Sequence, residues 1–172
     1  MTYKEQIFKS LSQMAEDADV LFMGYGVVYN SVLDGVPTNQ RLEMPLAENL
    51  MLGTAIGMAL EGYKPVVCFE RMDFLLNAMD SLVNHLDKIK IISDNQFDPA
   101  VIVRCVVGND NKPLYTGETH VQDFSASLSY MIDMCVDCID TRRPASKIDE
   151  LYRWTNESKV LVEYKDFYDE PL

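Results

Sequence analysis

The chain has 172 residues, of which 48% are apolar, enough for one well-buried domain and too few for two ordinary ones. Its formal net charge of −12 repels phosphate backbones and anionic membranes, which argues against nucleic acid or a membrane as a partner. No segment approaches the ~20 apolar residues of a membrane span. The first six residues lack the basic start and apolar core of a secretion signal, so we expect a cytoplasmic protein.

The first third of the chain predicts a helix, a strand, a long loop and a second helix. Residues 3–16 carry apolar side chains at helical spacing, and the apolar run at 20–23 predicts a buried strand that ends in a Gly-Tyr-Gly turn. Residues 29–45 contain Gly35, Pro37 and Asn39 and are expected to form loops. Residues 46–60 predict a helix that is apolar on nearly every face, and we therefore expect it to be central and buried.

Strands and helices continue to alternate over the rest of the chain. Strands are predicted at 65–69, 101–107, 135–139 and 160–164, helices at about 73–91, 125–134 and 147–157, and a polar loop at 108–119. The run at 101–107 is almost continuously apolar, which is typical of a strand buried on both faces of a parallel sheet. The pattern predicts an α/β fold, a single-domain three-layer sandwich with a mainly parallel twisted sheet.

The four cysteines give little sign of a metal or redox centre. Cys68 and Cys105 lie in apolar runs that predict buried strands, where a free thiol behaves as a small hydrophobic side chain. Cys135 and Cys138 form a C-x-x-C pair, but no second pair exists and no histidine lies at zinc-finger spacing. Residues three apart in a strand also face opposite sides. We therefore expect structural cysteines and no metal site.

Three segments, in order along the chain, carry a resemblance to a known family. The run Met44-Pro45-Leu46-Ala47-Glu48-Asn49 places a lone carboxylate in the first turn of the apolar helix, and the strand at 65–69 and the amphipathic stretch at 73–84 follow it. This ordered set resembles the pyrimidine-binding domain of transketolase-type thiamine diphosphate enzymes, in particular the N-terminal half of the pyruvate dehydrogenase beta subunits. The resemblance covers about residues 17–165 and implies that residues 1–172 form a single transketolase-like pyrimidine-binding domain.

Glu48 is the residue whose role depends most on this resemblance. From its position alone, an acidic residue in a first helical turn is explained by the helix dipole and the free backbone N–H groups, at ~0.3–1 kcal/mol. The resemblance implies a catalytic and cofactor-binding role instead. In the family this glutamate hydrogen-bonds N1′ of the aminopyrimidine ring and thereby activates the cofactor.

The resemblance also implies roles for Phe74, Met72 and His120. Phe74 falls where the beta subunits place the aromatic that stacks on the pyrimidine, although an aromatic at the start of an amphipathic helix is ordinarily core. Met72 matches a position of the same cofactor pocket that is more often aromatic in the family. His120 matches the histidine of the family's Gln-His-Ser-Gln loop and is expected to be catalytic, with an exposed loop histidine as the alternative.

The family's phosphate side is missing from this sequence. Family members hold the diphosphate through magnesium bound by a Gly-Asp-Gly motif, whereas the nearest match here is Gly108-Asn109-Asp110-Asn111, which follows the wrong element. The resemblance therefore implies half of an active site, with thiamine diphosphate and its magnesium completed by a separate diphosphate-binding chain. Glu70 and Arg71 replace an uncharged pair of the family, which implies a different pocket edge and substrate.

The function implied is that of a subunit, inactive alone, of a heteromeric oxidoreductase or transferase that cleaves a C–C bond next to the carbonyl of a 2-oxo acid or ketose. A homo- or hetero-oligomer is expected, because the helix at 46–60 has few polar residues for a free surface. Two alternatives stay open. One is a non-catalytic interaction or regulatory protein that retains the fold, and the other is a fragment of a longer beta-like subunit.

Overall fold

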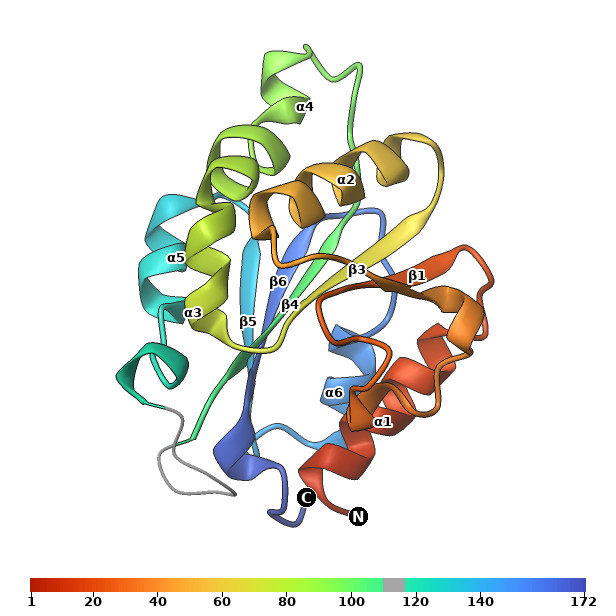
Figure 1. Ribbon diagram of the computed structural model, residues 1–172, viewed down its shortest axis with the longest axis vertical. Helices are drawn as coiled ribbons and strands as arrows, with labels where there is room; N and C mark the ends of the chain where they lie inside the picture. Colours follow the sequence, from red (N-terminus) through yellow and green to blue (C-terminus); the bar gives the residue numbers. More distant parts are fainter. Residues whose placement is uncertain (110–116) are drawn as a thin grey trace.

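Figure 1 shows the computed structural model, which describes residues 1–109 and 117–172. Its middle layer is a six-stranded sheet in the order β2-β1-β3-β4-β6-β5, in which all neighbouring strands are parallel. The strands are β1 (Val20–Gly24), β2 (Arg41–Glu43), β3 (Lys64–Phe69), β4 (Ile102–Val107), β5 (Cys135–Ile139) and β6 (Lys159–Tyr164). The predicted single-domain α/β fold is confirmed, and the sheet is wholly parallel. Of the predicted polar loop at 108–119, residues 110–116 lie outside the described part of the chain.

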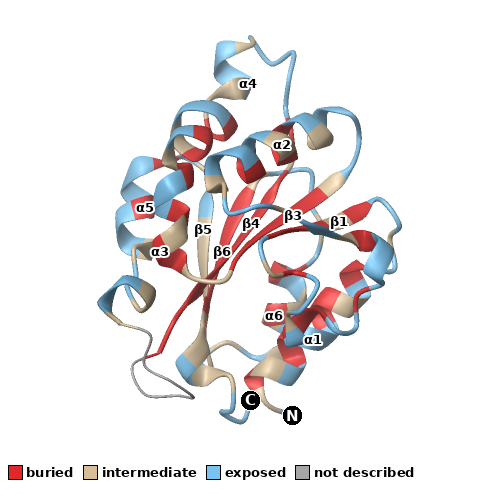
Figure 2. Ribbon diagram, viewed as in Figure 1, coloured by how far each residue is buried: buried red, intermediate tan, exposed pale blue. Residues whose placement is uncertain are grey.

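Helices cover both faces of the sheet (Figure 1). One face carries α1 (Tyr3–Met14) and α6 (Ala145–Leu151), and the other carries α2 (Glu48–Leu60), α3 (Met72–Leu75) and α5 (Ser125–Met131). The central strands are therefore buried on both sides, as Figure 2 shows for β3, β4 and β6. None of the described helices is long and apolar enough to cross a membrane. Short 3₁₀ turns complete the fold at Ser31–Leu33, Thr38–Gln40, Glu118–His120 and Lys165–Phe167.

Alternate residues of the central strands point into two separate cores, because successive side chains of a strand face opposite sides of the sheet. Val67 and Phe69 of β3 pack under α2, α3 and α5, whereas Val66 and Cys68 pack on the side of α1 and α6. Cys105 is buried in the first of these cores. Burial raises the pKa of the Cys68 thiol to about 11, so this cysteine is an unreactive part of the packing, as expected.

A buried ion pair joins β4 and β6 within the second core. Arg104 and Glu163 are at most 1% exposed, and the guanidinium donates two hydrogen bonds to the carboxylate, with 2.6 Å between Nη2 and Oε2. The hydroxyl groups of Tyr152 and Tyr168 donate to the same carboxylate, the latter at 2.7 Å. The pair is compensated because four donor contacts converge on one carboxylate, where an isolated buried charge would be very costly.

Buried phenols make the stability of this fold sensitive to alkaline pH. Burial, and then repulsion from Glu163, raises the pKa of Tyr3, Tyr152 and Tyr168 above the ordinary value of about 10. Above that pH the unfolded chain loses protons that the folded chain keeps, so the stability is complete below about pH 10 and falls as pH rises further. We expect tyrosinate absorbance to show these three groups ionising only together with unfolding. Their ionisation near pH 10 without loss of structure would contradict this.

The predicted helix at about 73–91 is broken into four pieces: α3, a 3₁₀ turn (Leu76–Ala78), a π-helical segment (Asp80–Leu86) and α4 (Ile89–Ile92). Ser81 supplies the reason. Its backbone N–H donates to Asn49 Oδ1 and its hydroxyl donates to the Asn49 carbonyl, both at 3.1 Å. These bonds to α2 replace a regular helical bond, and the N–H of Asp87 reaches back five residues to the carbonyl of Leu82.

Residues 29–60 differ from prediction in two further respects. The expectation that the helix at 46–60 is central and buried is wrong for the single chain, because α2 packs only one face, which includes Met51 and Leu52, against the sheet. Leu50 on the opposite side is 55% exposed. The predicted loop also contains the edge strand β2, which is only three residues long and is recognisable only from its pairing with β1.

Candidate functional site

A cavity of about 210 Å³ lies at the carboxyl ends of β1 and β3, beside the start of α2. Parallel α/β sheets bind ligands at this edge, outside the carboxyl ends of their strands. The walls are mostly apolar, with two carboxylates among them: Tyr25, Leu46, Glu48, Met51, Cys68, Phe69, Glu70 and Phe74.

The structure brings Glu48 and Phe74 to this one cavity. Glu48 is the first residue of α2 and is half-buried, and its carboxylate makes no hydrogen bond or ion pair within residues 1–109 and 117–172. Phe74 reaches the cavity from α3 and is also half-buried. The arrangement presents an unpaired acceptor and an aromatic ring to the same small space, which suits a flat heteroaromatic ligand.

His120 lies behind Phe74, outside the lining of this cavity. The two rings meet edge to face, with 5.3 Å between their centroids and an interplanar angle of 84°. Nδ1 of the imidazole is 3.1 Å from the Thr119 hydroxyl. Gln122 ties the same segment to α3, because its amide donates to Asp73 Oδ1 at 2.8 Å. The structure thus links His120 to the site through Phe74.

Met72 is placed away from the cavity, so the expectation of direct cofactor contact is corrected. Its side chain is 0% exposed and belongs to the core under α2, α3 and α5. Its sulfur accepts a hydrogen bond from the N–H of Phe124 at 3.3 Å. In this position Met72 anchors the start of α5 against α3 and has no surface available to a ligand.

The turn after β1 borders the cavity as well, although it was not predicted as part of the site. Glu43 of β2 accepts hydrogen bonds from the N–H groups of Gly26 and Val28, at 2.6 and 3.1 Å, and so holds the turn that carries Tyr25. Gly26 has a φ of +78°, which favours glycine there. The sequence held a signal for this turn. Gly24-Tyr25-Gly26 and Phe69-Glu70 each span the carboxyl end of a strand, and the two strands are neighbours at the edge where ligands bind.

Gly108, directly after β4, permits the position of His120. A Cβ atom at Gly108 would lie 1.9 Å from the backbone carbonyl oxygen of His120. We expect Gly108→Ala to displace residues 117–122, to separate His120 from Phe74 and to lower the free energy of unfolding by about 1–3 kcal/mol. Thermal unfolding and NMR contacts between the two rings would measure both effects.

Gly57→Ala is a matched control for this change, because a Cβ there meets nothing within 4 Å and α2 continues past it. It is expected to leave the two rings in contact and to stabilise the helix by about 1 kcal/mol. A Gly108→Ala protein with the same unfolding temperature and ring contact as the parent would contradict the prediction.

Within the described residues, no three His, Cys, Asp or Glu side chains come together in a way that could hold a metal ion. The segment Gly108-Asn109-Asp110-Asn111 is described only as far as Asn109, and its last two residues lie outside the described part of the chain. Cys135 and Cys138 are free thiols on β5, the former exposed and the latter half-buried.

No family model matches the sequence, but curated proteins and solved structures do. The chain is 29% identical to the mitochondrial pyruvate dehydrogenase E1 component subunit beta of Saccharomyces cerevisiae over 134 residues, which cover 73% of this chain and 36% of that protein. It is 27% identical to the 2-oxoisovalerate dehydrogenase subunit beta of Pseudomonas aeruginosa over 131 residues, which cover 71% of this chain and 37% of that protein. The chain therefore spans about a third of the length of these curated relatives.

Solved structures show the same fold at low sequence identity. A split-gene transketolase, described as an inactive beta4 tetramer, matches with a TM-score of 0.70 and 14% identity over 100% of this chain and 53% of its own. A thiamine diphosphate-dependent 4-hydroxybenzoylformate decarboxylase of Rhodococcus jostii matches with a TM-score of 0.63 and 16% identity, over 98% of this chain and 31% of its own. This chain is accordingly a homologue of pyruvate dehydrogenase E1 beta subunits over about 73% of its length, with the α/β fold of transketolase-type thiamine diphosphate enzymes.

Proposed function

We propose that this chain is the pyrimidine-binding subunit of a heteromeric thiamine diphosphate-dependent enzyme. The observation that carries the proposal is the cavity in which Glu48 and Phe74 meet. The aminopyrimidine ring of the cofactor is flat and has a ring nitrogen that can share a proton. A mostly apolar space of about 210 Å³, lined by the Phe74 ring and by the Glu48 carboxylate, fits such a ring.

Each residue of the site has a defined task in this proposal. Bound thiamine diphosphate supplies the nucleophilic carbon that attacks a substrate carbonyl. Glu48 holds a proton at N1′ of the pyrimidine, in an apolar wall where a hydrogen bond is stronger than in bulk water. Phe74 stacks on the ring and contributes about 0.5–1.5 kcal/mol beyond area burial. His120, held against Phe74, is the proton donor or oxyanion partner on the substrate side.

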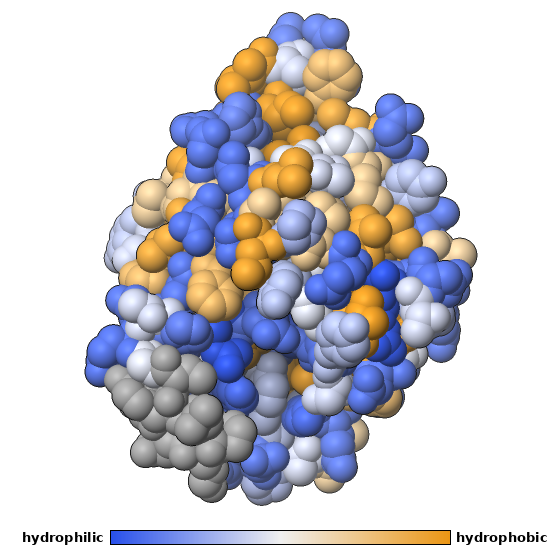
Figure 3. Space-filling view, viewed as in Figure 1, coloured by the Kyte–Doolittle hydropathy of each residue, from blue (hydrophilic) through white to orange (hydrophobic). Residues whose placement is uncertain are grey.

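The same proposal assigns the diphosphate and its magnesium to a separate chain. The sequence lacks a Gly-Asp-Gly motif, and the described residues hold no metal-binding cluster. The outer side of α2 exposes Leu50, Leu60 and the small residues Gly53 and Gly57, which supports its use as a docking face. Figure 3 shows apolar side chains on the face of the molecule that α2 and α3 cover. Such a surface supports assembly with a second copy, a partner chain, or both.

We expect the isolated chain to bind thiamine diphosphate with magnesium weakly or not at all. The cavity at Glu48 has room for one ring and carries no cation in its lining, and the net charge of −12 on the chain disfavours a diphosphate. Titration calorimetry of the isolated chain, and then of its mixture with a Gly-Asp-Gly partner chain, measures the difference. Binding, C–C cleavage of a 2-oxo acid or ketose and a larger mass by light scattering are expected only for the mixture. Sub-micromolar affinity in the isolated chain would count against the shared site.

The same experiment separates the alternatives. A chain that assembles with the partner without supporting turnover would be a non-catalytic interaction protein that retains the fold. A chain that becomes active only when extended at its C-terminus would be part of a longer beta-like subunit. Three points stay predictions. They are the identity of the substrate, whether the reaction is that of an oxidoreductase or of a transferase, and a cytoplasmic location.

A further inference from the structure

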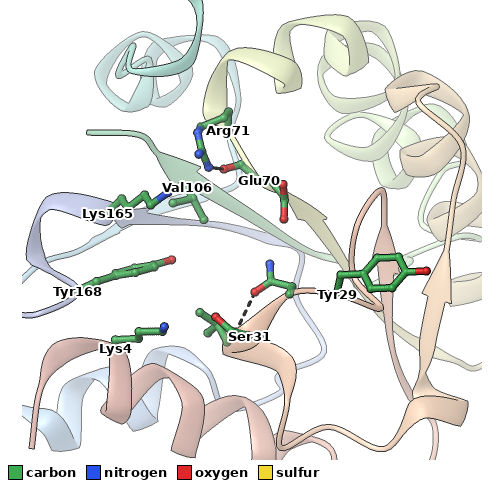
Figure 4. Close-up of a pocket in the computed structure, with 10 residues that line it drawn as sticks. Lys4, Tyr29, Ser31, Glu70, Arg71, Val106, Lys165 and Tyr168 are labelled. Atoms are coloured by element: carbon green, nitrogen blue, oxygen red, sulfur yellow. Dashed lines mark hydrogen bonds between the residues drawn. The ribbon is translucent and has the colours of Figure 1, made fainter. Parts of the chain in front are cut away.

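A second cavity of about 280 Å³ lies beside the first and shares Glu70 with it. Its lining comes from elements far apart in the sequence, as Figure 4 shows for Arg71 after β3, Lys165 after β6 and Lys4 in α1. It therefore opens at the same edge of the sheet as the first cavity, where the strands end. The chemistry of its lining differs, because three cations stand here, whereas the first cavity has none.

The cations of this cavity form no ion pair with the described part of the chain. Five lysines and arginines take part in no ion pair within residues 1–109 and 117–172, and three of the five line this one cavity: Lys4, Arg71 and Lys165, with Arg153 and Lys159 elsewhere. In a chain with 27 acidic residues, most cations find a carboxylate. The unpaired cations are thus concentrated where a ligand could reach them.

Arg71 is the most constrained of the three. One guanidinium nitrogen, Nη1, donates to the backbone carbonyl of Glu70, whereas Nε is buried and has no hydrogen-bond partner. A buried N–H without an acceptor is costly, so an oxygen atom that reached Nε after a small shift of the side chain would stabilise the group. A planar guanidinium that presents parallel N–H groups is the side chain that best matches the oxygens of a phosphate or carboxylate.

The neighbouring groups leave a net positive charge in the cavity, because its lining holds three cations and one carboxylate. The pKa of Lys165 is lowered by burial first and then by the nearby Arg71, with Lys4 adding to the repulsion and Glu70 opposing it. The Glu70 carboxylate makes no ion pair with any of these cations, and one of its oxygens lies near Gly26. Tyr168, also in the lining, directs its hydroxyl to the buried Glu163. A bound anion would remove this repulsion.

We propose that this cavity is a binding site for a small molecule that carries a phosphate group. A phosphate monoester has a charge of about −1.5 to −2 at neutral pH and three strong acceptor oxygens, which matches one guanidinium and two ammonium groups. Further donors stand in the lining at Ser31 and at the Asn30 amide, whose oxygen is already used by the N–H of Val32 at 3.0 Å. The volume leaves space beside a phosphate for a small organic part.

The test is titration calorimetry of the chain with inorganic phosphate, glycerol phosphate and malonate at constant ionic strength and without thiamine diphosphate. We expect saturable binding of both phosphates and weaker binding of the dicarboxylate. Tighter binding of glycerol phosphate than of phosphate supports a phosphorylated organic ligand, and equal affinity supports recognition of the phosphate group alone. No saturable phosphate binding, or malonate binding as tight as phosphate, overturns the proposal.

Two variants and a control locate the site. Arg71→Gln and Lys165→Gln are each expected to weaken phosphate binding at least about tenfold, a loss of about 1.4 kcal/mol. Arg153→Gln makes the same change in net charge at an exposed, unpaired arginine outside the cavity, and should leave the affinity unchanged. An equal loss in all three variants overturns the proposal, because it reports only the net charge.

The readout also stays interpretable if one variant is unstable. Arg71→Gln removes the bond to the Glu70 carbonyl, whereas the Lys165 side chain makes no hydrogen bond to the described residues. Lys165→Gln therefore carries the test if Arg71→Gln does not fold. Since neither the cofactor nor a partner chain is used, failure here is distinguishable from failure of the proposed thiamine diphosphate function.

Discussion

Replacement of Glu48 by glutamine is expected to lower the turnover of the assembled enzyme by several orders of magnitude while the fold and cofactor affinity stay nearly intact. Glutamine has the same shape and still occupies the first turn of α2, so the lost dipole interaction is at most ~1 kcal/mol. A neutral amide cannot hold the ring proton as a carboxylate does. The interaction is thereby lost where charge develops in the reaction, and each ~1.4 kcal/mol lost there is a tenfold decrease in rate.

The decisive measurement is hydrogen–deuterium exchange at C2 of the cofactor, followed by NMR on the reconstituted complex. Glu61→Gln is the matched control, since it makes the same change at the exposed C-terminal end of the same helix and should leave the exchange rate unchanged. If Glu48 only stabilises the helix start, its variant should show a slightly lower unfolding temperature and normal exchange. That result would refute the catalytic assignment.

Replacement of Glu163 by glutamine is expected to be the most destabilising single change on the other side of the sheet. The variant leaves the Arg104 guanidinium buried without its counter-ion, and Nη1 of that group already has no partner among the described residues. Removing one member of a buried pair typically costs about 3–5 kcal/mol of unfolding free energy. Urea unfolding followed by circular dichroism measures the loss.

Two comparisons make this second prediction specific. Glu150→Gln breaks only an exposed contact with Lys147 and should change the stability little. Adding Arg104→Met to Glu163→Gln removes the uncompensated charge and should recover much of the stability, because the glutamine amide oxygen can still accept hydrogen bonds from Tyr152 and Tyr168. A Glu163→Gln protein as stable as Glu150→Gln would show that the pair is dispensable.

Local sequence determined most of the elements and their order. The apolar run that became β4 is buried on both faces, as its composition predicted, and the stripe at 3–16 became α1. The position of Glu48 at a helix start is likewise a local property. Pro45 precedes this position and the polar residue Asn49 follows it, at the start of an apolar segment. The assignment of Glu48 and Phe74 to one pocket required the family resemblance, since neither residue type is unusual where it stands.

The tertiary structure decided which side chains share a space. Met72 and Phe74 lie two residues apart in α3, so their side chains project about 200° apart. Met72 is the buried one of the two, and it contacts Phe124. Bonds from Ser81 to Asn49 broke a helix that periodicity alone would continue. The pairing of Arg104 with Glu163 and the cavity of Lys4, Arg71 and Lys165 each join residues that are far apart in the chain. Such contacts follow from the order of the strands in the sheet and from the sheet edge at which the strands end. A local pattern of residues encodes neither the strand order nor this edge.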